Sequence, residues 1–109
     1  MKMITAIINK NDTDLVCSSL RDAGYTFTII ATVGGFLTRV NNTLLIGTED
    51  DKVEYALELI RKTCSRRSEV VPVAPYNGMG GAPLHSYMSE VMVGGAIVFV
   101  NDVTYFEKM

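Results

Sequence analysis

The feature of this sequence that most constrains its fold is a strand–helix–strand pattern at its start. Residues 1–9, MKMITAIIN, alternate with a period of two and are mostly apolar on both sides, which predicts a strand. Residues 11–24 carry apolar side chains at the i, i+4 and i+7 positions of an amphipathic helix. Residues 25–32, YTFTIIAT, return to a period of two, with threonines on one side and larger apolar side chains mainly on the other. This part of the chain therefore predicts a β–α–β unit.

The same pattern occurs a second time. Residues 42–47 predict a short strand, and residues 49–64 predict the clearest helix, because their apolar side chains recur at helical spacing. Residues 69–73 and 94–103 supply further strands. A duplicated strand–helix–strand unit is what a ferredoxin-like βαββαβ domain requires, with an antiparallel sheet and two crossover helices on one face. We therefore expect one α+β domain spanning residues 1–109.

The ends of both helices have recognisable signals. Asn11 or Asp12 can cap the first helix, and Gly24 can end it. Thr48 stands where an N-cap of the second helix is expected, and the acidic residues that follow it suit the positive end of the helix macrodipole. These signals predict where each helix begins and where the first one ends.

Two helices can cover only one face of such a sheet, yet two of its strands are apolar on both faces. The segments MITAII, residues 3–8, and AIVFV, residues 96–100, show this most clearly. A bare apolar face of roughly several hundred square ångströms is rare on a monomer. The sequence therefore predicts that several copies of this chain associate through their uncovered sheet faces.

Charge and composition argue against several classes of protein. There are 10 basic and 12 acidic residues, and the resulting net charge of −2 is unsuited to a broad nucleic-acid surface, which needs a cationic field. No apolar run reaches membrane length, so the protein is expected to be soluble and cytoplasmic, with neither nucleic acid nor membrane as a partner. Cys17 and Cys64 are expected to be buried free thiols, since their spacing suits neither a metal site nor a redox motif.

No constellation of side chains suggests catalysis. His85, the only histidine, lies in a predicted loop, where a solvated side chain is the simpler interpretation. Ser86 beside it lacks the context of a nucleophile elbow, and NGMGG lacks the Lys-Ser or Lys-Thr of a Walker motif. We therefore expect no enzyme activity, no catalytic residue, no cofactor and no metal site.

Two loops are predicted, at about residues 33–42 and 72–87, and the second is long and Gly-rich. Connections of that length inside a compact domain are usually functional or disordered. In the first loop Gly34 and Gly35 let main-chain amides approach a ligand, and Phe36 offers a flat face on which a base can stack. These features suggest a nucleotide pocket. A hairpin turn whose phenylalanine packs against a neighbour explains the same residues equally well.

The runs IATVGGFL, NNTLLIG and VGGAIVFV, in this order and at this spacing, resemble the PII-like cyclic di-AMP receptors of the PstA/DarA type. The resemblance extends nearly from end to end. It implies a homotrimer of ferredoxin-like subunits that binds the second messenger cyclic di-AMP in each cleft between neighbouring subunits. It also implies signal transduction, in which the loops rearrange on binding and pass the signal to a protein target that the sequence does not identify.

The resemblance also implies a set of ligand contacts in this sequence. The GGFL loop would contact adenine, Thr28 would help to hold a phosphate, and Asn41 and the Gly47 backbone would bind an adenine edge. Phe99 and the chain end near Lys108 would complete the walls. The ligand-binding residues expected on this basis are Thr28, Gly34, Gly35, Phe36, Leu37, Arg39, Asn41, Gly47, Phe99 and Lys108.

The sequence departs from the family pattern at three positions. Thr26 stands where the family has an arginine, Val40 where it has a glycine, and Lys108 where it has a glutamine. The missing arginine removes a phosphate donor, whose charge Arg39 or Lys108 could replace. Two alternatives stay open: a PII-like adaptor that senses ATP or ADP, and a structural trimer that binds no nucleotide.

Overall fold

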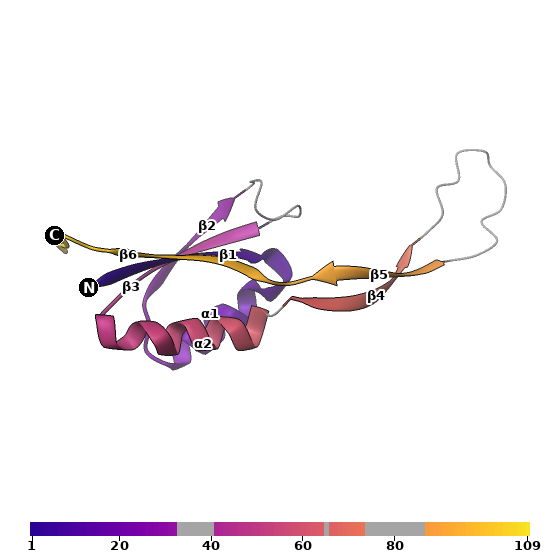
Figure 1. The fold of residues 1–109 in the computed structure, drawn as a ribbon. Coiled ribbons are helices and arrows are strands. Elements are labelled where there is room, and N and C mark those ends of the chain that lie inside the picture. The colour runs from indigo at the N-terminus through magenta and orange to yellow at the C-terminus, as the bar shows by residue number, and fades with distance from the viewer. Residues whose placement is uncertain (33–40, 65, 74–86) are drawn as a thin grey trace.

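The computed structural model describes residues 1–32, 41–64, 66–73 and 87–109. Figure 1 shows a sheet with two helices on one side and a two-stranded ribbon that extends away from it. The elements, in chain order, are β1 (Lys2–Asn9), the 3-10 helix η1 (Lys10–Asp12), α1 (Thr13–Asp22), β2 (Phe27–Thr32), β3 (Asn41–Thr48), the 3-10 helix η2 (Asp50–Lys52), α2 (Val53–Cys64), β4 (Arg67–Val73), β5 (Tyr87–Val93) and β6 (Ala96–Asp102).

The main sheet has four strands in the order β2-β3-β1-β6, and every neighbouring pair is antiparallel. In this order β2, which follows α1, lies beyond the central strand β3, and β6, the next strand of this sheet after α2, lies beyond the central strand β1, as two crossover connections require. The mixed α+β architecture expected from the sequence is confirmed and fits the ferredoxin-like fold. The expected strands of this sheet agree with the observed ones within about two residues, which is the usual uncertainty at strand ends.

The core lies between the helices and one face of the sheet. On that face Ile4, Ala6 and Ile8 of β1 are buried, and Ile46 and Leu44 of β3 stand opposite Ile4 and Ala6. Burying one large aliphatic side chain of this kind stabilises a fold by about 1.5–3 kcal/mol. The helices complete the core with Val16, Cys17 and Leu20 of α1 and Ala56, Ile60 and Cys64 of α2.

The opposite face of the sheet, called here the open face, has no helix over it in the described residues (Figure 1). Thr5 of β1 stands between Leu45 and Phe99 on this face, and Phe99 is 45% exposed. Ile30 of β2 is 43% exposed on the same side. The apolar character expected on both faces of the sheet is therefore confirmed. The residues of the open face are Met3, Thr5, Ile7, Asn9, Thr28, Ile30, Thr32, Asn41, Thr43, Leu45, Gly47, Ile97, Phe99 and Asn101.

The β4–β5 ribbon corrects one expectation from the sequence. The strand expected at residues 69–73 is β4, but it pairs with β5 in a separate two-stranded sheet, and β5 was not expected at all. Its sequence, YMSEVMV, lacks the strict alternation that marks a strand. The ribbon pairs Arg67 with Val93 at its base and Val73 with Tyr87 at its far end.

The ribbon also changes the extent of the expected loops. Residues 72 and 73 belong to β4 and residue 87 to β5, and residues 74–86 of that expected loop lie outside the described residues. The other expected loop, residues 33–42, ends in β3, and its residues 33–40 also lie outside the described residues.

Two glycines join the ribbon to the main sheet. Gly94 has a φ of +77° and Gly95 a φ of +84°, values that strain any residue with a side chain. The amide of Gly95 donates to the carbonyl of Cys64, the last residue of α2. These two glycines therefore form the junction where the ribbon returns to the sheet.

The first helix begins differently from the expectation. The side-chain oxygen of Asn9 accepts from the amide of Asn11 at 2.9 Å and so caps the short η1 turn. Asp12 occupies the N-cap position of α1, but its carboxylate makes no capping hydrogen bond. It pairs with Arg67 instead, at 2.9 Å. Neither Asn11 nor Asp12 is a side-chain cap, because Asn9 satisfies the first amide and Asp12 has a cation as partner.

The remaining helix signals give one confirmation and one correction. Gly24 ends α1 with a φ of +90°, and the amide of Tyr25 donates to the carbonyl of Leu20 at 3.0 Å, a Schellman arrangement. Thr48 is the buried last residue of β3, and Glu49 takes the N-cap position of η2. The expected cap at Thr48 is wrong because the strand continues through that residue.

Both cysteines are buried free thiols, as expected. Burial raises the pKa of the Cys64 thiol to about 11 and also raises the pKa of Cys17. Thiols with raised pKa values form little thiolate near neutral pH, so neither is a nucleophile. In the described part of the chain no helix has the length and apolar character needed to cross a bilayer.

Candidate functional site

A hollow of about 350 Å³ lies at the end of the sheet where β1 begins and β3 ends. Thr28 of β2 stands opposite Leu45, and Met3 of β1 stands opposite Gly47, so strand alternation presents these four residues on the open face. The hollow is lined by Met1, Met3, Thr26, Phe27, Thr28, Leu45, Gly47, Val103 and Phe106. Its wall is mainly apolar, and the Thr28 hydroxyl and the main chain of Gly47 lie beside it.

The main chain is approachable at Gly47. A Cβ placed there would lie 3.5 Å from Cε of Met1, which is ordinary van der Waals contact. An alanine would therefore fit the fold and would place its methyl group in the hollow. The side chain of Thr28 is exposed beside it, so its hydroxyl is free to bind a ligand oxygen.

The segment after β6 forms one side of the hollow. The amide of Val103 donates to the carbonyl of Met1 at 3.1 Å, which holds this segment against the start of β1. Phe106 follows three residues later and is 64% exposed at the rim. An exposed aromatic ring at the edge of a hollow offers a surface for stacking a base.

A second hollow of about 350 Å³ adjoins the first and shares Met1, Thr26 and Gly47 with it. The rings of Tyr25 and Tyr55 border it with centroids 6.4 Å apart, and the Tyr25 hydroxyl donates to the carbonyl of Lys52 at 2.7 Å. Burial raises the pKa of Tyr25, so this hydroxyl keeps its proton and its hydrogen bond. The bond ties the segment before β2, which carries Thr26, to the start of α2.

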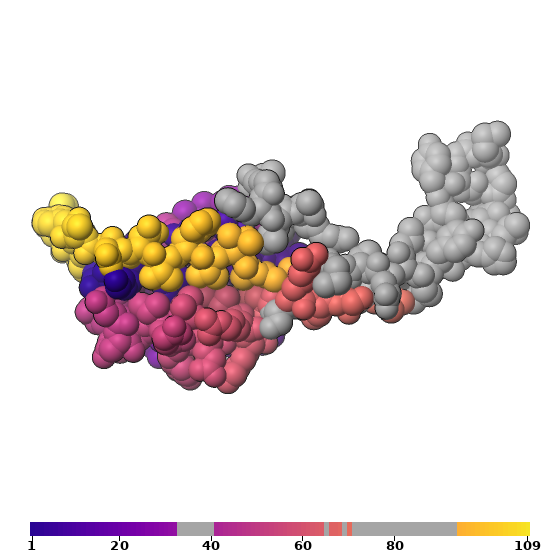
Figure 2. Space-filling model, viewed as in Figure 1, coloured from indigo at the N-terminus to yellow at the C-terminus, as the bar shows by residue number. Residues whose placement is uncertain are grey.

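A third hollow, of about 450 Å³, lies between α2 and β6. Figure 2 shows this side of the molecule, with β6 running along α2. It is lined mainly by Leu57, Ile60, Ala96 and Val98, on the helix-covered side of the sheet. None of the residues expected to bind ligand lines it, so it is a weaker candidate than the hollow beside Thr28.

The five expected ligand residues that the structure describes fall into separate places. Thr28 and Gly47 line the same hollow. Asn41 begins β3, and the six residue steps from it to Gly47 correspond to about 20 Å along a strand. Its side chain is buried, with 1% exposed. Phe99 lies on the open face of β6, and Lys108 is exposed in the segment after β6. One subunit therefore brings together only two of these five residues.

The other expected ligand residues lie outside the described part of the chain. They are Gly34, Gly35, Phe36, Leu37 and Arg39. Their roles stay predictions from the sequence. No lysine or arginine is among the described residues that line the hollow beside Thr28. A cation for a phosphate would therefore come from elsewhere than these described lining residues.

Sequence reasoning missed several residues of this hollow, among them Met3, Leu45 and Phe106. A signal for the first two was present. Each has the strand parity that places it on the same face as Thr28, once the pairing of β1, β2 and β3 is known. The sequence alone gives no register between strands, so it could not bring these residues together.

Comparisons with known proteins now decide the family. The family model described as cyclic-di-AMP receptor matches residues 1–109. The chain belongs to the cyclic-di-AMP receptor family. Its fold is similar to the crystal structure of a functionally unknown protein from Pediococcus pentosaceus ATCC 25745, with a TM-score of 0.78 and 31% identity over 99% of this chain and 96% of that chain.

The resemblance to cyclic di-AMP receptors inferred from the sequence is thereby confirmed. Membership in a receptor family supports a signalling protein that binds cyclic di-AMP and implies a binding role rather than a catalytic one. Among the described residues, no group of three or more His, Cys, Asp or Glu side chains is placed to hold a metal ion.

Proposed function

We propose that this receptor is a PII-like signal-transduction protein, a homotrimer that binds one cyclic di-AMP in each cleft between subunits. Loop rearrangement then passes the signal to a protein target, and the receptor performs no chemistry of its own. The observation that carries the proposal is the match of the whole chain to the cyclic-di-AMP receptor family. The open face supports the assembly, and the hollow beside Thr28 supports the location of the ligand.

The open face is suited to self-association because its exposed apolar side chains have no helix over them. Ile30 and Phe99 alone are 43% and 45% exposed. Meeting of three such faces would remove this surface from water, with a gain of about 25 cal/mol for each square ångström of apolar area. A neighbouring subunit would also supply the ligand contacts that one chain does not bring together, which is why the site is proposed between subunits.

Each ligand contact has a chemical role in this proposal. The Thr28 hydroxyl donates to a phosphate oxygen, and the bare main chain at Gly47 binds an adenine edge. Phe36 of the GGFL loop stacks on one purine, and Lys108 or Arg39 provides the charge that the family obtains from an arginine at the position of Thr26. Asn41 becomes a ligand contact only if its side chain turns out of its buried position.

The energy required is within reach of such a site. Micromolar affinity corresponds to about 8 kcal/mol. Stacking supplies about 1–3 kcal/mol for each base, and charge-assisted hydrogen bonds to the phosphates add to this before the ordering costs are subtracted. Two stacked purines and a few phosphate contacts are therefore sufficient.

Calorimetric titration of the purified protein with cyclic di-AMP tests the ligand. We expect one ligand per subunit, and at least about tenfold weaker binding for Phe36→Ala and Gly47→Ala. Thr26→Arg, which restores the family's arginine, should tighten binding. Absence of heat from the wild-type protein at tens of micromolar, roughly the concentration that detects micromolar affinity, would reject the ligand assignment.

Light scattering tests the assembly independently of the ligand. A mass of three subunits is expected. A protein that stays a single subunit at about 100 µM would leave no cleft between copies, and the proposed site would be rejected with it.

One observation favours a second candidate, a PII-like adaptor that senses ATP or ADP. The family arginine is replaced by Thr26, which borders both hollows without a charge. A thermal-shift panel of ATP, ADP and cyclic di-AMP distinguishes the two, because only the true ligand raises the melting temperature in a dose-dependent way.

A further inference from the structure

A polar contact joins the start of β3 to the start of α1. The side-chain amide of Asn42 donates to the Thr13 hydroxyl oxygen at 2.8 Å. The same hydroxyl donates to the carbonyl of Asn9 at 3.2 Å. Thr13 is 7% exposed, so both bonds are shielded from water. The hydroxyl of Thr13 therefore fixes the second residue of β3, next to Asn41, against the end of β1.

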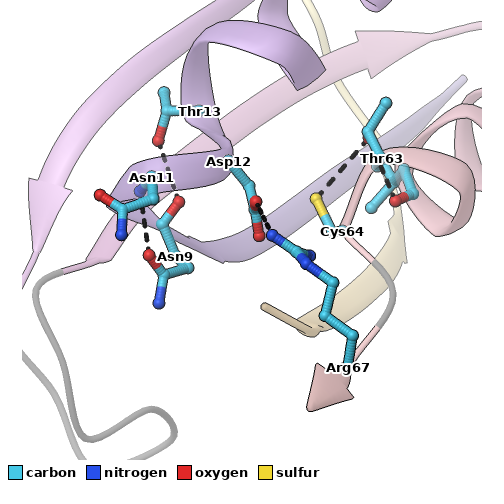
Figure 3. Close-up of polar contacts among 8 residues, drawn as sticks. Asn9, Asn11, Asp12, Thr13, Thr63, Cys64 and Arg67 are labelled. Atoms are coloured by element: carbon cyan, nitrogen blue, oxygen red, sulfur yellow. Dashed lines mark hydrogen bonds and ion pairs between the residues drawn. The ribbon is translucent and has the colours of Figure 1, made fainter. Parts of the chain in front are cut away.

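A second contact joins α1 to the base of the β4–β5 ribbon. Figure 3 shows the carboxylate of Asp12 facing the guanidinium of Arg67, with Oδ1 and the nitrogen 2.9 Å apart. The Asp12 side chain is 6% exposed, and its other oxygen, Oδ2, is buried without a hydrogen-bond partner. A carboxylate shielded in this way depends on its cation, so a shift of Arg67 away from Asp12 is costly.

The two contacts are consecutive in the sequence and lie at the same end of the sheet. Asp12 and Thr13 follow one another where η1 meets α1, so the backbone holds their side chains in one rigid turn. At this end Asn9 pairs with Asn41, and one residue earlier in β1, Ile8 pairs with Ala96, just after the glycine junction of the ribbon. The start of β3 and the base of the ribbon therefore both contact the turn formed by Asp12 and Thr13.

We propose that Asp12 and Thr13 are positioning residues that link the start of β3 to the β4–β5 ribbon. Ligand bound against β3 shifts the strand at Asn42, Thr13 follows Asn42, and Asp12 carries Arg67 and the ribbon with it. This inference rests on the proposed function, since it names the route by which ligand binding reaches a segment that could contact a protein target. Coupling of this kind is reciprocal, so a change at the ribbon also alters the start of β3.

Hydrogen exchange of the full chain, with and without cyclic di-AMP, tests the link. In the wild-type protein, ligand should alter exchange in both β3 and the ribbon. Thr13→Val and Asp12→Asn should remove at least about half of the ribbon response while the dissociation constant changes by less than about threefold. Thr13→Ser, which keeps the hydroxyl, should retain the response. Glu58→Gln, which breaks an exposed ion pair on α2, is the matched control and should also retain it.

The outcome is decisive in either direction. A full ribbon response in both Thr13→Val and Asp12→Asn would overturn the link while leaving cyclic di-AMP binding intact. If Thr13→Val does not fold, Asn42→Ala takes its place, because it removes the same contact and leaves the bond from Thr13 to Asn9.

A measurement without ligand separates this inference from the proposed function. Thr13→Val should raise exchange in β4, and Arg67→Met should raise exchange at the start of β3, each at least about twofold. If the wild-type protein binds no cyclic di-AMP, the proposed function fails, and these two variants still decide the link. The link is rejected if Thr13→Val changes exchange only around β3 and Arg67→Met changes exchange only in the ribbon.

Discussion

The two faces of the main sheet are both apolar, but only one is covered. On the helix-covered face the side chains of Ile4, Ala6 and Ile8 are fully buried. On the open face Met3, Thr5 and Ile7, which alternate with them in the same strand, are only partly buried. One strand thus carries two apolar rows with different surroundings. The covered row holds the subunit together, and the open row is available for contacts with other copies and for ligand.

The comparison also explains where the candidate site lies. The helices pack against the covered face, and the hollow beside α2 is lined by none of the expected ligand residues that the structure describes. The hollow beside Thr28 and Gly47 is formed at the end of the open face, where the strands stop and the segment after β6 turns across them. The proposed assembly and the proposed ligand site therefore draw on the same surface, which is the physical reason for expecting them to be linked.

Substitution of neighbours in β1 tests the difference most directly. Ile8→Ala should lower the free energy of unfolding by about 3 kcal/mol at every protein concentration, because it opens a cavity in the covered core. Ile7→Ala should cost less than about 1 kcal/mol in dilute protein, with a cost that grows as the concentration rises. Urea denaturation followed by circular dichroism measures both. Equal costs in dilute solution would show that the two faces do not differ in the subunit.

Placing a carboxylate on one side or the other of the edge strand β2 tests which face of the sheet carries the contact between copies. Ile30→Asp places a carboxylate on the open face, and we expect association to weaken by more than about tenfold, because the charge must be desolvated when the subunits meet. Ile29→Asp is the matched control, since Ile29 is 47% exposed on the other side of the same strand. Light scattering over a dilution series should show dissociation for Ile30→Asp alone. Loss of assembly in both variants would place the contact at the strand edge rather than on the open face.

The covered face should also give a pH dependence. Burial raises the pKa of Cys64 to about 11, so the folded protein holds this proton where an unfolded thiol has lost it. The stabilising contribution is complete below the unfolded pKa, near 9, and is lost as the pH rises through the folded pKa. We expect a loss of about 1 kcal/mol by about pH 10, measured by urea denaturation. Cys64→Ala should flatten this slope, whatever its effect on stability at pH 7.

The smallest effect on stability is expected on the solvent-exposed side of α2, which faces neither the covered nor the open face of the sheet. Glu58 and Lys62 form an exposed i, i+4 pair at 3.4 Å. Glu58→Gln should cost about 0.3 kcal/mol, and the cost should vanish at high salt because exposed pairs are screened. Thermal unfolding at low and high salt measures it. A cost above about 1 kcal/mol would mean that surface charge matters more in this subunit than its exposure suggests.

Much of the fold could be predicted from the sequence because its signals are local. The strands near residues 1–9, 25–32 and 42–47 follow from period-two alternation, and both helices follow from apolar spacing. That neither Asp12 nor Thr48 acts as a side-chain cap could not be predicted, because Arg67 pairs with Asp12 and β3 continues through Thr48. The strand β5 was missed since its pairing with β4, rather than its own pattern, makes it a strand.

The sequence by itself determined the α+β class, the two apolar faces and the membership of the cyclic-di-AMP receptor family. These depend on residue types and on spacings along the chain. Only the tertiary structure decided that Thr28 and Gly47 share a hollow, that Asn41 is buried at the other end of β3, and that Asp12 pairs with Arg67. Each of these depends on strand register or on a contact between distant segments. Many registers satisfy the same alternation, and packing of the whole chain selects one of them.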